Sequence, residues 1–227
     1  MTTENKKAGG YAASLAAAAA VRALGAYLMA IGGTAAALVA AQAHHTTAMV
    51  AGGVFALFGW VLASRAKSQY QKAAIGARSE RRVARALRQL RPVALANSLL
   101  LGAGGDADHV VVGPWLCVVE TKTGRGRVRW QGGHLVAGTR TIPGNPLAQA
   151  RAQSTQVTRL THEYCDAIVC VPDMTNPPFV QDGVTVCSLA DLRRVVTALR
   201  PRLDSNDAAR VFSHLQATDL HQRQLTK

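Results

Sequence analysis

The sequence lacks several motifs that mark common kinds of enzyme. It contains no glycine-rich GxxxxGK[ST] loop for nucleotide phosphates. It also contains no GxSxG segment, and no cysteine and histidine arrangement of the kind that activates a nucleophile. ATP-driven work and a nucleotide cofactor are therefore not expected of this chain, and neither is hydrolysis through an activated serine or cysteine.

Cysteine is scarce and shows no metal-binding or redox pattern. The four cysteines lie in apolar runs, with no CxxC pair and no regularly spaced histidines beside them. We therefore expect buried thiols of a reducing compartment, rather than a zinc site or a disulfide framework. These residues are Cys117, Cys165, Cys170 and Cys187.

Acidic residues are outnumbered, because 13 Asp and Glu stand against 26 Lys and Arg, giving a formal net charge of +13. A basic domain tends to bind polyanions, either nucleic acid or anionic lipid headgroups, and charge alone does not choose between them. Nearly all of the charge follows Arg65, whereas the preceding segment is mostly Ala, Leu, Val, Gly, Phe and Met. The pattern indicates a membrane anchor joined to a basic soluble domain.

Two apolar segments, residues 23–43 and 47–63, are each close to the ~20 residues that a helix needs to cross a ~30 Å hydrocarbon core. The short connection between them predicts a transmembrane helical hairpin; a buried helical hairpin of a soluble protein is the alternative. Glycine pairs at 32–33 and 52–53 fall near the middle of the spans, where small residues let two helices approach closely. The hairpin is also a candidate surface for a homodimer.

Basic residues flank the two apolar segments but are absent from the loop between them. Lys and Arg concentrate on the cytoplasmic side of membrane proteins, so both termini and the soluble domain are expected in the cytoplasm. Usage rich in Ala and Arg suggests a bacterium, and hence the bacterial inner membrane. The flanking residues are Lys6, Lys7, Arg22, Arg65, Lys67 and Lys72.

The most informative pattern lies between Asp106 and Lys122, where two predicted strands flank the three-residue loop 113–115. With a loop of this odd length, Asp108 pairs with Glu120. Asp106 then pairs with Lys122, and cross-strand partners lie about 5 Å apart on one face. A two-residue turn would put Asp108 and Glu120 on opposite faces. Three carboxylates and one ammonium in one patch are the groups that metal-dependent nucleases use.

A helix is predicted over residues 73–90, because Val83, Leu87 and Leu90 recur at helical spacing while arginines lie largely elsewhere. Glu80 falls on the same packed stripe, where an unpaired carboxylate is costly. An arginine at the edge of the stripe would account for it, and so would a metal or a lysine on the sheet below.

The remaining pattern predicts an α/β sandwich, with one helix, a meander of strands, a second helix, and further strand and helix. Asn145 is expected to cap the second helix, with Pro146 at its first position. The strands expected besides the hairpin span 93–101, 128–130, 134–136, 167–171 and 184–187, and the closing helices span 189–199 and 208–220.

Four short motifs carry a resemblance to a known family. They are Gly76-x-x-x-Glu80-x-x-Val83, Asp106-x-Asp108-His109-Val-Val-Val-Gly113-Pro114, Glu120-Thr121-Lys122 and Asn145-Pro146-x-x-Gln149. In this order they resemble the nuclease-related domain, NERD, of the restriction-endonuclease-like superfamily with its PD-(D/E)xK signature. The resemblance covers residues 73–186 and implies a core of helix, β-meander, helix and strand, here preceded by the two-helix transmembrane hairpin.

This resemblance implies a metal-dependent phosphodiesterase. Asp108 and Glu120 would ligate Mg²⁺ or Mn²⁺, which prefer hard oxygen ligands completed by water and a phosphate oxygen. Lys122 would orient or deprotonate the attacking water and offset charge in the transition state. The other matched positions are Glu80, a further ligand in some members of the superfamily, and the auxiliary Asp106 and Gln149.

The chain departs from the family pattern at three places. Ser79 stands where glycine is frequent, Ala107 replaces the signature proline, and Thr123 replaces a common asparagine. None of these changes removes a ligand.

Three arginines after the hairpin frame Trp130 and suit phosphate or headgroup binding, so they are candidate nucleic-acid contacts. DNA is accordingly the expected partner. Three functions stay open: a membrane-tethered nuclease, a catalytically inactive DNA- or protein-binding module of the same fold, and a structural membrane protein whose basic face meets lipid. The arginines are Arg125, Arg127 and Arg129.

Five parts are expected along the chain. They are a partly helical cytoplasmic segment (1–22), the transmembrane hairpin (23–65), a linker helix (66–77), the nuclease-like domain (78–188) and C-terminal helices (189–227).

Overall fold

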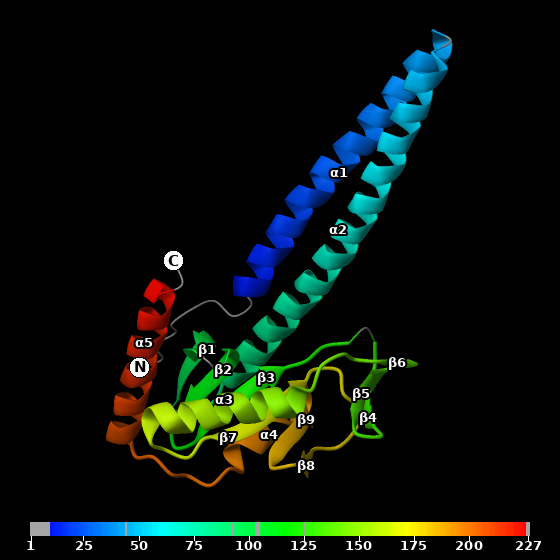
Figure 1. Cartoon of the computed structure of the whole chain (residues 1–227). Coiled ribbons are helices and arrows are strands. Elements are labelled where there is room, and N and C mark those ends of the chain that lie inside the picture. Colours follow the sequence, from blue (N-terminus) through cyan, green and yellow to red (C-terminus); the bar gives the residue numbers. More distant parts are fainter. Residues whose placement is uncertain (1–9, 44, 92, 103–104, 125, 226–227) are drawn as a thin grey trace. The chain divides into compact units, whose positions relative to one another are not determined.

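The computed structural model describes residues 10–43, 45–91, 93–102, 105–124 and 126–225. The chain divides into two compact units, with Tyr11–Ile75 forming one and Gly76–Lys227 belonging to the other. The first unit is a helical hairpin and the second a mixed α/β domain (Figure 1).

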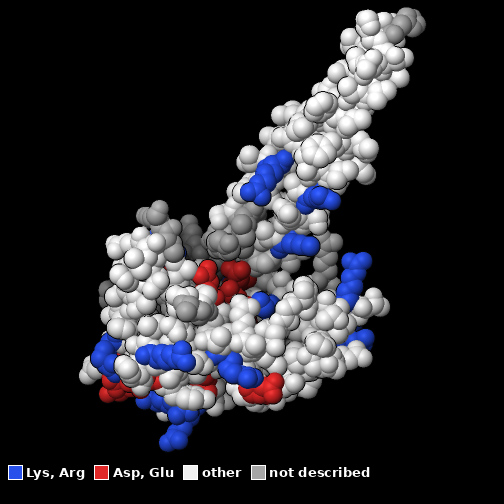
Figure 2. Space-filling view, in the orientation of Figure 1, with Lys and Arg blue, Asp and Glu red and all other residues white. Residues whose placement is uncertain are grey.

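Two long helices form the hairpin unit, α1 (Gly10–Gln42) and α2 (Thr46–Leu87). Both carry stretches long and apolar enough to cross a membrane, judged by length and composition. In the face shown in Figure 2 the hairpin is almost free of charged side chains along most of its length. The two predicted apolar helices are therefore present.

Small residues recur every seven positions where α1 meets α2, a spacing that keeps one seam of each helix facing its neighbour. A Cβ atom added to Gly52 would lie 2.7 Å from the backbone nitrogen of Ala37, and one added to Gly59 would lie 2.6 Å from that of Ala30. The helix backbones thus touch. The buried residues of the seam are Ala19, Ala26, Gly33 and Ala40 on α1, and Gly52, Gly59 and Ala66 on α2.

Gly52→Leu is expected to loosen the hairpin, because its side chain has no space against α1 and overpacking typically costs about 1–3 kcal/mol. Gly53→Leu is the matched control, since a Cβ there meets nothing within 4 Å. Unfolding of the full chain by titration with a denaturing detergent measures the difference. Equal midpoints for the two variants would contradict the close packing.

The second apolar span, the linker helix and the first helix of the α/β domain, which the sequence predicted as successive segments, form one continuous helix, α2. No proline interrupts residues 46–91, and the alanines around Gly76 favour helix strongly enough to carry it through.

Six strands form the main sheet, in the order β1-β2-β3-β7-β9-β8. Strands β1, β2 and β3 are antiparallel, β3, β7 and β9 run parallel, and β8 is antiparallel to β9. The strands are β1 (Ala94–Leu100), β2 (Asp106–Val112), β3 (Leu116–Thr121), β7 (Asp166–Val171), β8 (Phe179–Gln181) and β9 (Val184–Ser188). The predicted strands at 93–101, 167–171 and 184–187 are confirmed, whereas the short β8 carries no clear alternating pattern and was missed.

Helices cover both faces of this sheet, which explains why its central strands are apolar on both sides. One core lies beneath α3 (Pro146–Thr161) and α5 (Ser205–Leu225), and includes Val157 and Leu215. The other lies beneath the C-terminal part of α2 and α4 (Leu189–Thr197), and includes Leu87. The α/β sandwich predicted from the sequence is present. All four cysteines are free and buried.

The predicted single meander is wrong in its second half. Strands β4 (Val128–Gln131), β5 (His134–Ala137) and β6 (Arg140–Thr141) form a separate three-stranded sheet, and β3 pairs with β7 instead. Alternating apolar residues predict strands, but they do not specify which distant strand each one joins.

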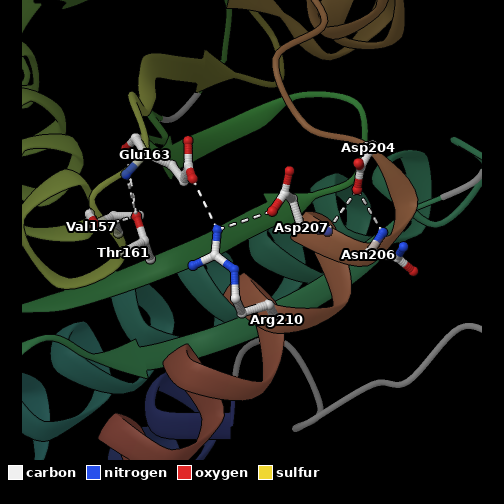
Figure 3. A network of polar contacts seen from close by, with 7 residues as sticks. All are labelled: Val157, Thr161, Glu163, Asp204, Asn206, Asp207 and Arg210. Carbon is white, nitrogen blue, oxygen red and sulfur yellow. Dashed lines mark hydrogen bonds and ion pairs between the residues drawn. The ribbon is translucent and has the colours of Figure 1, made fainter.

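Capping residues fix the ends of the helices around the main sheet. Asn145 accepts the N–H of Ala148 and Pro146 opens α3, as predicted. At the start of α5, Asp204 accepts two N–H groups, and Arg210 binds both Asp207 and Glu163 beyond the end of α3 (Figure 3). These contacts tie α5 to α3.

The far end of α5 is bound to the edge strand β1. Asp219 accepts the N–H of Leu100 and pairs with Arg223 at 2.6 Å, and Arg223 also donates to the carbonyl oxygen of Ser98. Ser98 has a φ of 51°, in the left-handed region that costs a non-glycine residue energy. Side chains of α5 thus satisfy backbone groups on the outer edge of the sheet.

Candidate active site

The hairpin of β2 and β3 has the register that the three-residue loop predicts. Val112 pairs with Leu116 and His109 with Val119, and Asp108 and Glu120 are the next residues along the two strands. The loop between the strands is residues 113–115. Because the side-chain period along a strand is two, this loop length decides that both carboxylates share one end of the hairpin.

The carboxylate of Asp108 is bound by the backbone of the neighbouring strand β3. Its Oδ2 atom accepts the backbone N–H of Thr121 at 2.7 Å. The pKa of Asp108 lies well above its ordinary value, first because burial disfavours the charged form, and then because Glu120 and Glu80 repel it. Three carboxylates, from β2, β3 and α2, therefore influence one another at this point.

Glu120 is only 2% exposed, and both of its oxygens have partners. Oε1 lies 2.7 Å from the ammonium of Lys122, and Oε2 accepts the side-chain N–H of Gln153 at 2.8 Å. The Lys122 ammonium donates to Oε1 of Gln149 at 2.9 Å. Lys122 is thus directed by one carboxylate and one amide, and Glu120 is fixed from both sides.

Asp106 does not make the predicted pairing with Lys122. Strand β3 ends at Thr121, and the backbone N–H of Lys122 donates to Cys170 of β7. Asp106 is exposed, and it contributes a backbone oxygen that accepts the side-chain N–H of Gln153 at 2.7 Å. The pairing of β2 with β3 ends at His109 and Val119, before it reaches Asp106.

Gln153 was not among the predicted site residues, although the sequence contains a signal for it. It lies three residues after Ala150 and four before Val157, in the middle of the buried stripe of α3. Its side chain is 1% exposed, and a buried amide must find partners. Here those partners are Glu120 and the backbone of Asp106, while its Oε1 has none among the described residues.

The donor set fits a hard divalent cation of the Mg²⁺ kind. Within the described part of the chain, no group of three His, Cys, Asp or Glu side chains is arranged to hold a metal by itself. Mg²⁺ does not require such a cage, because it is usually held by one or two carboxylates with water and substrate phosphate. Asp108 and Glu120 supply two carboxylates, and their crowding favours a positive charge between them.

The arginines predicted to contact nucleic acid lie beside the separate sheet. Arg127 and Arg129 are exposed on either side of the buried Val128, at the start of β4. Arg125 lies outside the described residues. The Trp130 ring packs against Phe179 at 5.6 Å between centroids, so it belongs to the fold of this region.

His109, next to Asp108, is buried and neutral. Its Nδ1 lies 2.8 Å from Oδ1 of Asn97, an acceptor, so Nδ1 carries the proton. Burial, and then the charge of Arg88, lower the pKa of His109 to about 3. The residue therefore joins β1 to β2 beside the candidate site without carrying charge at neutral pH.

Stability is expected to fall as pH drops below the unfolded-state pKa of His109, because the unfolded chain then binds a proton that the folded chain refuses. Each pH unit between ~6.5 and about 3 costs about 1.4 kcal/mol. From pH 6.5 to 4.5 the loss is about 2 kcal/mol. Denaturant unfolding of the wild type and of His109→Gln, which keeps a donor for Asn97, measures this slope. Equal slopes in the two proteins would contradict it.

The mixed sheet with helices on both faces, and the two apolar helices before it, are consistent with a nuclease-like core. Residues 75–172 match the family model of the nuclease-related domain, NERD, which has this fold. This part of the chain is therefore a nuclease-related domain, as the motifs indicated. No curated protein and no solved structure matches the chain.

Proposed function

We propose that the protein is a membrane-anchored, Mg²⁺- or Mn²⁺-dependent nuclease that hydrolyses phosphodiester bonds of DNA at the cytoplasmic face of the bacterial inner membrane. One observation carries the proposal. Lys122 contacts Glu120 at 2.7 Å, beside the strongly repelled carboxylate of Asp108. The match of residues 75–172 to the nuclease-related domain supports the same chemistry.

In this mechanism Asp108 and Glu120 hold the metal, with Glu80 a candidate for further negative charge. When bound, the metal would polarise the scissile phosphate and lower the pKa of a water molecule. Lys122 orients the attacking water and stabilises the negative charge that develops on the phosphate. Gln149 directs the Lys122 ammonium, and Gln153 keeps the Glu120 carboxylate in one orientation.

The anchor follows from the two apolar helices of the hairpin unit. Arg22 precedes the long uncharged stretch of α1, and Arg65 and Lys67 follow the apolar part of α2, which supports cytoplasmic termini. A nuclease facing a chromosome from the membrane acts only on DNA that reaches the membrane surface.

The test is cleavage of single-stranded, double-stranded and branched DNA by the full chain in detergent, with Mg²⁺ or Mn²⁺. We expect cleavage by the wild type and a loss of at least ~100-fold in Lys122→Met, since removal of one transition-state donor typically costs this much. Arg194→Gln, an exposed change on α4, serves as the control.

The absence of cleavage on every substrate would overturn the proposal. Salt-sensitive DNA binding that persists in Glu120→Gln/Lys122→Met would then assign the chain to the binding modules of this fold.

A further inference from the structure

The C-terminal part of α2 carries an arginine stripe, made of the exposed Arg78, Arg81, Arg85 and Arg88. At 3.6 residues per turn these four positions fall within ~80° of the helix circumference. The buried Val83 and Leu87 lie on the opposite side, against the sheet. Apolar residues thus pack α2 on the sheet, while the four arginines are exposed.

Helix α2, which carries the stripe, reaches the candidate active site, because the charge of Glu80 acts on Asp108. Arg82 on the same helix pairs with Asp173 at 3.2 Å, and the carbonyl oxygen of Asp173 accepts the N–H of Val128. Asp173 follows β7, whose Cys170 accepts the backbone N–H of Lys122. One strand end thus connects α2, the lysine of the site and the small sheet.

Helix α2 and strand β4 both carry basic side chains, and both bind the segment after β7. Val128, bound to Asp173, lies between the exposed Arg127 and Arg129. Arg82 of α2 binds the side chain of the same aspartate. Both groups belong to the same compact unit as the carboxylates.

We infer that the arginine stripe binds the phosphate backbone of double-stranded DNA and, with Arg127 and Arg129, directs the duplex across the carboxylate site. From Arg78 to Arg88 the helix rises ~15 Å, along which duplex DNA presents about nine phosphate charges. Guanidinium groups suit phosphate, because they bind it in a bidentate way. The inference deepens the proposed function, on which it rests for the nature of the polyanion.

Anionic lipid is the competing polyanion, and the arrangement of charges favours DNA. Arg65, Lys67 and Lys72 follow the apolar part of α2 and belong to the hairpin unit, where headgroup contacts are expected. The arginine stripe belongs to the other unit, which also contains the carboxylates, and its helix is bound through Arg82 to Asp173 after β7.

The test compares Arg78→Gln/Arg85→Gln with Arg159→Gln/Arg200→Gln in the full chain, reconstituted in nanodiscs of neutral lipid. Both pairs are exposed, both variants lose two positive charges, and glutamine is a good helix former. Binding of a labelled duplex is measured by anisotropy at several salt concentrations without divalent cation. Without the cation no cleavage is expected, so the assay measures DNA binding alone. Its result can therefore be interpreted even if the nuclease assay fails.

We expect roughly tenfold weaker binding in the stripe variant at about 0.1 M salt, with a slope of log affinity on log salt that is less steep by about 2, since each lost phosphate contact contributes about 0.9. The control should bind as the wild type does. Equal affinity and slope in the two variants would overturn the inference. A second result would also overturn it. If the stripe variant bound DNA normally, and if anionic nanodiscs raised the melting temperature of the wild type but not that of the variant, the arginines would be assigned to lipid headgroups.

Discussion

Asp108→Asn is expected to abolish metal binding and, at the same time, to raise the stability of the metal-free protein at neutral pH. In the wild type, burial and the charges of Glu120 and Glu80 oppose ionisation of Asp108 and raise its pKa. An asparagine keeps an oxygen for the N–H of Thr121 while removing the repelled charge. Functional carboxylates commonly destabilise the fold that holds them.

The sign of the pH dependence follows from the raised pKa. Between the ordinary value of 3.8 and the raised one, the folded protein binds more protons than the unfolded chain, so stability falls as pH rises through this window. The Asp108→Asn variant should lack this decline. At pH values above the window, it should unfold at a higher temperature than the wild type.

Calorimetric titration with Mg²⁺ and thermal unfolding with and without Mg²⁺ measure both effects in the full chain. Added Mg²⁺ should raise the unfolding temperature of the wild type and leave that of the variant unchanged. The affinity of the variant for Mg²⁺ should be at least ~100-fold lower than that of the wild type. A variant that binds Mg²⁺ as the wild type does would remove Asp108 from the metal site. If the variant were less stable than the wild type without Mg²⁺, the charge of Asp108 would not destabilise the fold, and the prediction would be wrong.

Lys122→Met is expected to destabilise the domain by about 3 kcal/mol, besides reducing cleavage. The substitution leaves Glu120 buried and charged without its ammonium partner, which is the costly way to break a buried ion pair. Glu120→Gln in the same chain should restore most of the loss, because the remaining amide carries no charge. Chemical denaturation of the two single variants and the double variant measures the coupling.

The matched control is a solvent-exposed ion pair with a similar distance between its charged atoms. Arg194 and Asp191 lie 2.6 Å apart, but the arginine side chain is 70% exposed. Arg194→Gln should change the free energy of unfolding by no more than ~1 kcal/mol, as for most exposed pairs. If Lys122→Met cost no more than this control, the prediction that the buried ion pair matters for stability would be wrong.

The sequence predicted the site where local geometry determines it. The three-residue loop alone places Asp108 opposite Glu120, because register and face follow from loop length. The helix cap at Asn145 could be predicted for the same reason, because it depends only on neighbouring residues. Both features depend on a few consecutive residues, so their prediction needs no information about distant parts of the chain.

The contacts that the sequence did not predict are non-local. Pairing of β3 with β7 joins residues about fifty positions apart, and the backbone N–H of Lys122 continues it to Cys170. Gln153 reaches Glu120 from another element, although its place on the buried stripe of α3 was visible. Periodicity shows that a residue is buried, but not which group it meets.

The bonds from α5 to the outer edge of β1 limit how far the nuclease-related domain can be shortened. An edge strand with free N–H and C=O groups is a template for pairing with another chain. Removal of α5 would take away the Asp219 and Arg223 contacts and the apolar Leu215 together. A fragment that ends where the family match ends is therefore expected to aggregate through β1, so the last helix belongs to any soluble, well-behaved form of this domain.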